Sequence, residues 1–176
     1  GACNLCQISC PTGALDKEYT LDSNKCISYW LQSPDIIPHE MRINIGNRFY
    51  GCDECLTSCP PGQTKEFDET KTSTVDLKKI LSMTNEELVE KYSWFYIPKR
   101  NGDFLKRNAL IALANNPDEY SVKIIHNLLK SDSEIIRFYS IWAIWKITKF
   151  IDIEKFYDVD LEESELVKNE YLRLMK

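Results

Sequence analysis

The sequence predicts a mainly α-helical protein built from two unlike parts. All seven cysteines lie within the first 59 residues, and the rest of the chain contains none. A polar stretch with proline and glycine, residues 60–75, separates the two parts and is typical of a linker. After it, apolar residues recur at helical spacing. The composition, with 43% hydrophobic and 28% charged residues, is that of a folded chain rather than a disordered one.

The cysteines form two runs of the same pattern, C-x2-C-x3-C-P. The first run is "CNLCQISCP", the second is "CDECLTSCP", and Cys26 stands alone between them. Zinc would accept one C-x2-C pair, and a disulfide framework would need an even number of cysteines in a secreted protein. Two matched runs that each end in Cys-Pro indicate instead the motif of two-cluster bacterial ferredoxins, C-x2-C-x2-C-x3-C-P.

In that motif the fourth cysteine binds the neighbouring cluster. The first ligand position would fall before Gly1 in one run and on Phe49 in the other, where Cys26 could replace it. One upstream cysteine and the seven present make eight, the number that two [4Fe–4S] clusters need. We therefore expect cluster 1 to take the upstream cysteine with Cys3, Cys6 and Cys59, and cluster 2 to take Cys10, Cys26, Cys52 and Cys55.

Helix signals follow the linker in order. Thr84 with Glu87 three residues later is a capping-box signature for the start of a helix. In "DFLKRNALIALANN" apolar residues recur at helical spacing, and Asp103 is the expected N-cap. The next pattern opens with Pro117, a residue favoured in the first turn of a helix.

The last third of the chain predicts two further helices and a repeat. One helix follows Asp132 and Ser133, either of which could cap it, and an amphipathic helix is expected over residues 161–175. A shift of 31 residues aligns 103–114 with 134–145, with small and basic residues at matching places. This repeat predicts stacked helix pairs of a HEAT-like solenoid, although an ordinary four- or five-helix bundle stays open.

These features predict three segments. A ferredoxin-like domain would cover residues 1–65, a linker and connecting helix 66–98, and a HEAT-like repeat domain 99–176. The chain has no initiating methionine and begins inside a motif, so we expect a piece of a longer protein. No apolar stretch is long enough to cross a membrane, and no secretory signal is in view.

Three stretches in a fixed order resemble the C-terminal portion of the epoxyqueuosine reductase family: "CNLCQISCPTGAL", "LDSNKCISYW" and "IIPHEMRINIGNRFYGCDECLTSCP". The later "IPKRNGDFLKRNALIALAN" is similar to the segment that opens the family's helical repeat. The resemblance is good over residues 1–115, weakens over 116–150 and is lost in the acidic tail. It implies an oxidoreductase of queuosine biosynthesis, which reduces epoxyqueuosine in tRNA with cobalamin as the reacting cofactor and the clusters as electron suppliers.

The resemblance also implies partners: tRNA, the cobalamin domain of the full-length chain and a small electron-donor protein. We expect a monomer that does not enter a membrane, in the reducing cytoplasm. The family's cobalamin domain is not among these residues and no catalytic acid can be named, so we expect the piece alone not to be catalytic. The alternative is a free-standing two-cluster electron carrier of ferredoxin type with a helical docking domain.

A basic patch in an acidic protein predicts the tRNA contacts. The net charge is −5, yet "IPKRNGDFLKRN" gathers Lys99, Arg100, Lys106 and Arg107, and Arg137 holds the equivalent place in the next repeat. These side chains would bind backbone phosphates, which gives a salt-sensitive attraction independent of sequence. The alternative is a solvated helix start whose cations only face water.

Two further groups leave alternatives open. Four aromatic residues precede the basic patch and could stack on RNA bases or simply pack in the core: Tyr92, Trp94, Phe95 and Tyr96. Arg42 and Arg48 flank "INIG" before the second cysteine run. Either arginine could contact a corrin side chain or a phosphate, or could pair with a carboxylate.

Overall fold

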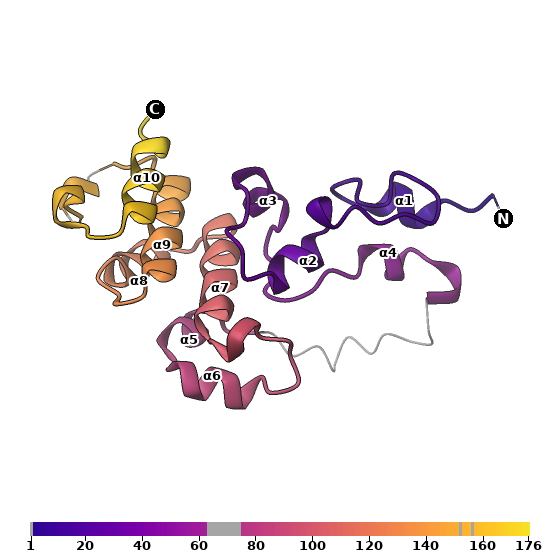
Figure 1. Ribbon diagram of the computed structural model, residues 1–176, viewed down its shortest axis with the longest axis horizontal. Helices are drawn as coiled ribbons and strands as arrows, with labels where there is room; N and C mark the ends of the chain where they lie inside the picture. Colours follow the sequence, from indigo (N-terminus) through magenta and orange to yellow (C-terminus); the bar gives the residue numbers. More distant parts are fainter. Residues whose placement is uncertain (1, 63–74, 152, 156) are drawn as a thin grey trace.

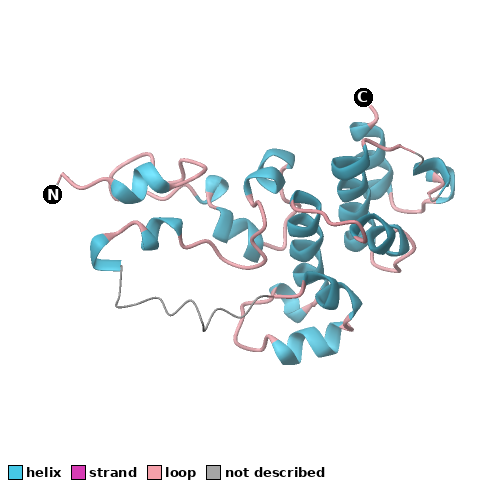
Figure 2. Cartoon of the chain, turned by 180° about the vertical axis from the view of Figure 1, so that it is seen from behind, coloured by secondary structure: helices cyan, strands magenta, loops and turns pink. Residues whose placement is uncertain are grey.

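The computed structural model describes residues 2–62, 75–151, 153–155 and 157–176. Within these ranges every regular element is a helix, and none is a strand (Figure 2). The predicted mainly α-helical fold class is thereby confirmed. None of the helices within these ranges has the length and apolar character needed to cross a membrane. The expected domain limit at residues 65 and 66 lies outside the described residues, so the domain boundaries stay a prediction.

The cysteine-rich part forms one end of an elongated molecule (Figure 1). Its helices are short: α1 (Leu5–Ser9), α2 (Ile27–Gln32), α3 (His39–Asn44) and α4 (Glu54–Thr57), with 3-10 turns η1 (Ser23–Lys25) and η2 (Pro60–Gly62). α1 stops because Cys10 takes an extended conformation (ψ 114°) and Pro11 cannot continue the helix. α1 and α4 pack side by side, so the two cysteine runs meet.

The other part is a stack of helices that includes the longest ones of the described residues. The helices of the stack are α5 (Leu77–Ser82), α6 (Asn85–Lys91), α7 (Asp103–Asn115), α8 (Ser121–Leu128), α9 (Glu134–Thr148) and α10 (Glu165–Leu174), with 3-10 turns η4 (Pro98–Arg100), η5 (Ile153–Lys155) and η6 (Val159–Leu161). α7 packs on both α5 and α9, and α9 also packs on α8 and α10. Stacking of alternate helices is the order that a solenoid of helix pairs requires. The HEAT-like identity of the stack stays a prediction.

Two sequence signals for helix starts are confirmed. Thr84 caps α6: its hydroxyl accepts a hydrogen bond from the Glu87 N–H (3.2 Å), and its own N–H donates to the Glu87 carboxylate (2.8 Å). Ser133 is the N-cap residue of α9. α7 begins at Asp103 and α9 at Glu134, so the two helices start 31 residues apart, as the repeat predicted.

Two other helix starts differ from the prediction. Asp103 is the first residue of α7 rather than its N-cap, which is Gly102. α8 begins at Ser121 and not near Pro117. The cause is Asp118, whose carboxylate accepts hydrogen bonds from the Tyr120 N–H (3.1 Å) and the Ser121 hydroxyl (2.8 Å). These bonds hold a turn between the proline and the helix.

One continuous core joins the two parts. Buried apolar side chains of α2 and α3 belong to the same cluster as those of α5, α7 and α9. Buried hydrogen bonds fasten the junction: the Tyr139 hydroxyl accepts from the Ile37 N–H (2.8 Å), and the Asn108 amide donates to the Leu31 carbonyl (2.8 Å). Because Leu31 lies in the last turn of α2, that bond satisfies a carbonyl that the helix leaves unpaired. The cysteine-rich part is thus held in a defined position on the stack.

Candidate functional site

Four cysteines from separate segments line one small cavity. They are Cys10, Cys26, Cys52 and Cys55, and the other walls include the apolar side chains of Ala14, Leu15, Leu21 and Ile27. The same four cysteines were assigned to cluster 2 from their spacing. The structure brings them together, and their binding of iron stays a prediction.

The turn after Cys10 presents its sulfur to this cavity. Gly13 takes a left-handed conformation (φ +64°) that brings the backbone back toward the cysteine. The Ala14 N–H then donates a hydrogen bond to the Cys10 sulfur (3.2 Å). Burial raises the pKa of the Cys10 thiol, but hydrogen bonds from Thr12 and Ala14 outweigh it, so the pKa is lowered overall. A lowered pKa favours the thiolate, which is the form that binds metal.

The other three thiols come from helix starts. Cys26 is the N-cap residue of α2, and Cys55 lies in α4, preceded by Cys52 just after Gly51 in a left-handed turn (φ +72°). Burial raises the pKa of the Cys55 thiol, and the charges of the three neighbouring thiols raise it further. A metal cation bound beside the Cys55 sulfur would act in the opposite direction and favour its thiolate form.

The donor set fits a cluster rather than a single ion. Over the described part of the chain, no three His, Cys, Asp or Glu side chains lie close enough to hold one metal ion. In a [4Fe–4S] cube each thiolate binds a different iron, so its ligands stand further apart than those of one ion. Four thiols around a largely apolar cavity are compatible with that arrangement.

The cluster 1 side is less complete among the described residues. Cys3 and Cys6 line a second, more open hollow. Cys59 lines neither cavity, but the two runs are paired symmetrically: Ser9 and Ser58, which each precede the last cysteine of a run, have hydroxyls 2.7 Å apart. This contact places the ends of the two runs next to each other, and the assignment of Cys59 to cluster 1 stays a prediction.

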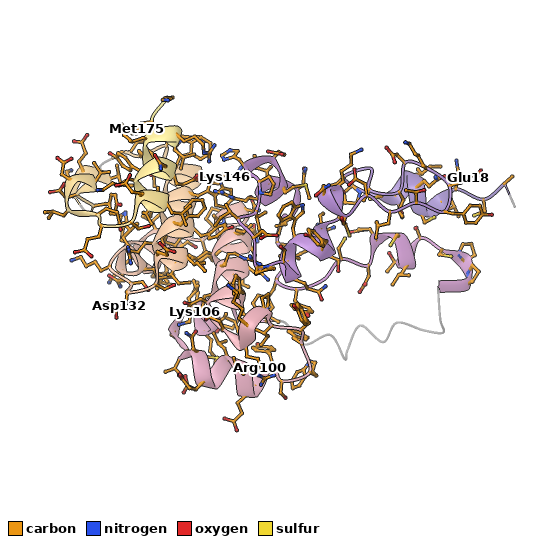
Figure 3. The ribbon with its side chains drawn as sticks, viewed as in Figure 1. Glu18, Arg100, Lys106, Asp132, Lys146 and Met175 are labelled. Atoms are coloured by element: carbon orange, nitrogen blue, oxygen red, sulfur yellow. The ribbon has the colours of Figure 1, made fainter. Side chains whose placement is uncertain are left out.

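Three predicted phosphate contacts are open to solvent or partly so. Lys99 and Arg100 lie exposed in η4, before α7, and Lys106 is half-buried on the first turns of α7. Figure 3 shows Arg100 and Lys106 in the lower part of the helical stack, far from Glu18 at the cluster end. The structure therefore keeps these three as candidates.

For Arg107 the expectation of a phosphate contact is wrong. Its side chain is buried, with 1% of the residue exposed. The guanidinium donates to the backbone carbonyls of Ser33 (2.8 Å), Trp30 (3.2 Å) and Leu31 (3.3 Å) at the end of α2. Neighbouring residues of a helix point in different directions, so Lys106 faces outward while Arg107 faces α2.

Arg137 is engaged in a different contact. Its guanidinium forms two hydrogen bonds with the Glu162 carboxylate (2.9 and 2.8 Å) and one with the Ser131 carbonyl (2.7 Å). The hydrogen bond to Glu162 raises the pKa of Arg137, and it lowers the pKa of Glu162. Arg137 would have to leave this pair to meet a phosphate, so its predicted role loses support.

Arg42 and Arg48 both pair with carboxylates. Arg42 is buried and donates to Glu170 (2.6 Å), and Arg48 pairs with Glu54. Of the alternatives that the sequence left open, the structure thus supports ion pairing. No described residue is assigned to cobalamin.

Sequence reasoning overlooked Tyr50. Its ring stacks on Phe95 (3.9 Å between centroids), and its hydroxyl accepts a hydrogen bond from the Tyr96 N–H (2.8 Å). Tyr50 and Tyr96 lie 46 residues apart in sequence, so no local pattern indicates the contact. Because Tyr50 stands two residues before Cys52, it ties the segment before the basic patch to the cluster site.

Comparison with known proteins first defines the class. Residues 1–62 match the family model of the 4Fe-4S double cluster binding domain. Residues 1–62 therefore belong to the class of double-cluster 4Fe-4S domains, and a helical stack follows them.

Relatives then identify the family. The chain is 37% identical over 184 residues to an uncharacterized protein from the gldA 3′ region of Geobacillus stearothermophilus, covering 98% of this chain and 84% of that protein. It is 36% identical over 155 residues to the epoxyqueuosine reductase of Bacillus subtilis, covering 84% of this chain and 40% of the reductase. A crystal structure of epoxyqueuosine reductase with an epoxyqueuosine-modified tRNA-Tyr stem loop superimposes with a TM-score of 0.84 at 33% identity, over 99% of this chain and 49% of that one.

The chain belongs to the family of proteins homologous to the C-terminal half of the epoxyqueuosine reductases. It spans less than half the length of the reductases that it matches.

Proposed function

We propose that this chain is the electron-transfer and tRNA-binding part of a cobalamin-dependent epoxyqueuosine reductase, which reduces epoxyqueuosine to queuosine in tRNA. The observation that carries the proposal is the cavity lined by Cys10, Cys26, Cys52 and Cys55, in a chain homologous to these reductases. Bound clusters would supply one-electron transfer. We propose that cobalamin is held by the part of the reductases that this chain does not match.

The chain's own residues hold and shield the cluster 2 site. Trp30 fixes the turn before Cys26, since its indole N–H donates to the Asn24 carbonyl (2.7 Å). The apolar walls of the cavity, such as Ile27, limit the access of water. Burial and hydrogen bonds to sulfur are the means by which proteins set cluster potentials. These residues therefore support a role as an electron relay.

The tRNA role is supported by the exposed cations and by the relative. Lys99, Arg100 and Lys106 can reach backbone phosphates, whereas Arg107 cannot. The homologue of known structure is described with a tRNA stem loop. We propose that this chain binds its tRNA through the surface that carries Lys99, Arg100 and Lys106.

A paired experiment tests both halves of the proposal. The full chain is reconstituted with iron and sulfide without oxygen, and its iron and acid-labile sulfide are counted. Binding of an epoxyqueuosine-modified tRNA stem loop and of a fully paired duplex RNA of equal length is then titrated at several salt concentrations. We expect [4Fe–4S] absorption and salt-dependent binding that favours the stem loop, because phosphate contacts release counterions.

The alternative is a two-cluster electron carrier whose helical stack docks a protein. It predicts the same clusters without affinity for the stem loop. Clusters together with absent RNA binding would favour this carrier, and zinc in place of iron would refute both.

A further inference from the structure

The segment that joins α6 to α7, residues 92–102, carries exposed aromatic residues and exposed cations within a few positions of one another. Of its four aromatic residues, Tyr92 is buried and Phe95 half-buried, whereas Trp94 is 73% and Tyr96 63% exposed. The structure thus divides a group that the sequence left undecided. Single exposed aromatic residues are common on protein surfaces, whereas two within three residues, beside exposed cations, are more informative.

Tyr92 and Phe95, the two less exposed rings, anchor the segment to the cysteine-rich part. Phe95 stacks on both Tyr92 (5.3 Å between centroids) and Tyr50 (3.9 Å), and Tyr92 also contacts Phe49 (5.7 Å). The Tyr50 hydroxyl holds the Tyr96 backbone on both sides, accepting from its N–H (2.8 Å) and donating to its carbonyl (3.1 Å). The exposed rings therefore stand on a fixed base.

The far end of the segment is equally fixed. A Cβ on Gly102 would lie 3.1 Å from the backbone of Asn85, so a larger residue would push the segment a few tenths of an ångström away from α6. Between the two anchors, Lys99 (φ +52°) and Arg100 (φ +50°) both take left-handed conformations. Residues with a Cβ rarely adopt that backbone, and strained positions of this kind gather at functional sites.

We propose that Trp94 and Tyr96 are a stacking platform for unpaired RNA bases, with Lys99 and Arg100 binding the adjoining phosphates. This inference rests on the proposed function, because it specifies which part of the tRNA the surface takes: unpaired loop nucleotides rather than a paired stem. Aromatic rings accept any base through its π-face, and a neighbouring cation neutralises the phosphate between stacked bases. Rings held on a rigid base lose little freedom on binding, which favours affinity.

The test measures the affinity of the full, cluster-loaded chain for a tRNA stem loop. Trp94→Ala and Tyr96→Ala should each weaken binding roughly five- to hundredfold, because stacking on an aromatic side chain contributes that much per base. Trp94→Phe should retain most of the affinity. The slope of log affinity against log salt should not change in these variants, since they remove no phosphate contact.

The matched control is Tyr120→Ala, since Tyr120 is 59% exposed but lies at the start of α8 outside this segment. It should bind as the unaltered chain does. Tryptophan fluorescence gives a second measurement that does not depend on an affinity change. The stem loop should quench the unaltered chain, and most of the quenching should be lost in Trp94→Phe, because Trp30 and Trp142 are buried and Trp145 is only partly exposed on α9.

The outcomes separate this inference from the function on which it rests. If the unaltered chain binds no stem loop, the proposed tRNA-binding function is refuted, and the stacking platform with it. If it binds with the expected salt dependence, but the alanine variants bind equally well and quenching persists in Trp94→Phe, then only the platform is refuted.

Discussion

Adjacent residues Lys106 and Arg107 have opposite surroundings. The Lys106 side chain is half-buried on the surface, whereas the Arg107 guanidinium serves the carbonyls of α2. Burial lowers the pKa of Arg107, against the raising influence of Tyr139 and Asp35, but guanidinium stays charged in proteins. Because the Arg107 guanidinium is buried and satisfies several carbonyls, it stabilises the fold and does not bind RNA.

Substitution of the two neighbours should separate binding from stability. Lys106→Ala should leave the unfolding midpoint unchanged and reduce the salt slope of RNA binding by about one, as for one lost phosphate contact. Arg107→Ala should lower the free energy of unfolding by about 3 kcal/mol, because it leaves buried carbonyls unpaired. Urea titration and RNA titration of the two variants side by side check this. A stable Arg107→Ala protein would contradict the structural role.

Cys26 is the proposed cluster ligand that stands outside both runs. We expect Cys26→Ala to lose one cluster's worth of iron and sulfide, since cluster 2 would keep only three of its four thiolates. The helical stack should stay folded, because Cys26 lies at the far end of α2 from the contacts with α7. Metal analysis with far-UV circular dichroism tests both statements. An unchanged iron content would exclude Cys26 from the ligand set.

At the scale of elements, short helices depend on their caps. α6 has seven residues, fewer than an isolated helix needs, and its buried contact is Leu88. The capping box of Thr84 and Glu87 satisfies two N–H groups that the first turn leaves unpaired. Asn85, the first residue of α6, packs closely against Gly102, where the segment with the exposed aromatic rings ends.

Thr84→Ala should destabilise the chain by about 1 kcal/mol through loss of this cap. The measurement is the shift of the urea midpoint. Ser82→Ala is a suitable control, because the Ser82 hydroxyl donates to the Lys79 carbonyl of its own helix and caps no helix start. Equal stability of the two variants would show that the capping box contributes nothing here.

At the scale of the whole molecule, one buried ion pair joins the cysteine-rich part to the last helix. Glu170 of α10 is 4% exposed and binds Arg42 of α3 (2.6 Å) and Arg173 (2.8 Å). Burial raises the pKa of Glu170, but the hydrogen bond from Arg173 and the charge of Arg42 outweigh it and hold the pKa below its ordinary value. His39 also contacts Arg173, and burial with the two arginines lowers its pKa.

This network predicts a stability that depends on pH. A carboxyl with a lowered pKa in the folded state stabilises that state above the unfolded pKa, and the contribution is lost as pH falls through the folded pKa. At neutral pH, Glu170→Gln should cost about 3 to 5 kcal/mol, because Arg42 is left buried without its counter-charge. The difference in unfolding free energy between the two proteins should shrink below a pH of about 4. A difference independent of pH would contradict this role of Glu170.

Much of this protein's structure can be predicted from short sequence patterns. The pattern C-x2-C-x3-C-P, the box at Thr84 and the 31-residue repeat each act over a few residues or one helix, so the sequence alone predicts the helical class, the cluster type and the start of α9. The same spacing also predicts which four thiols meet at the cluster 2 cavity.

Only the tertiary structure decides which side chains face outward. Lys106 and Arg107 are alike in sequence, and the packing of α2 on α7 makes one a surface cation and the other a support. Likewise Trp94 is exposed and Phe95 covered because Tyr50, 45 residues before Phe95, occupies one face of the segment. A local pattern carries no information about a partner that distant, because chain folding alone brings the two together.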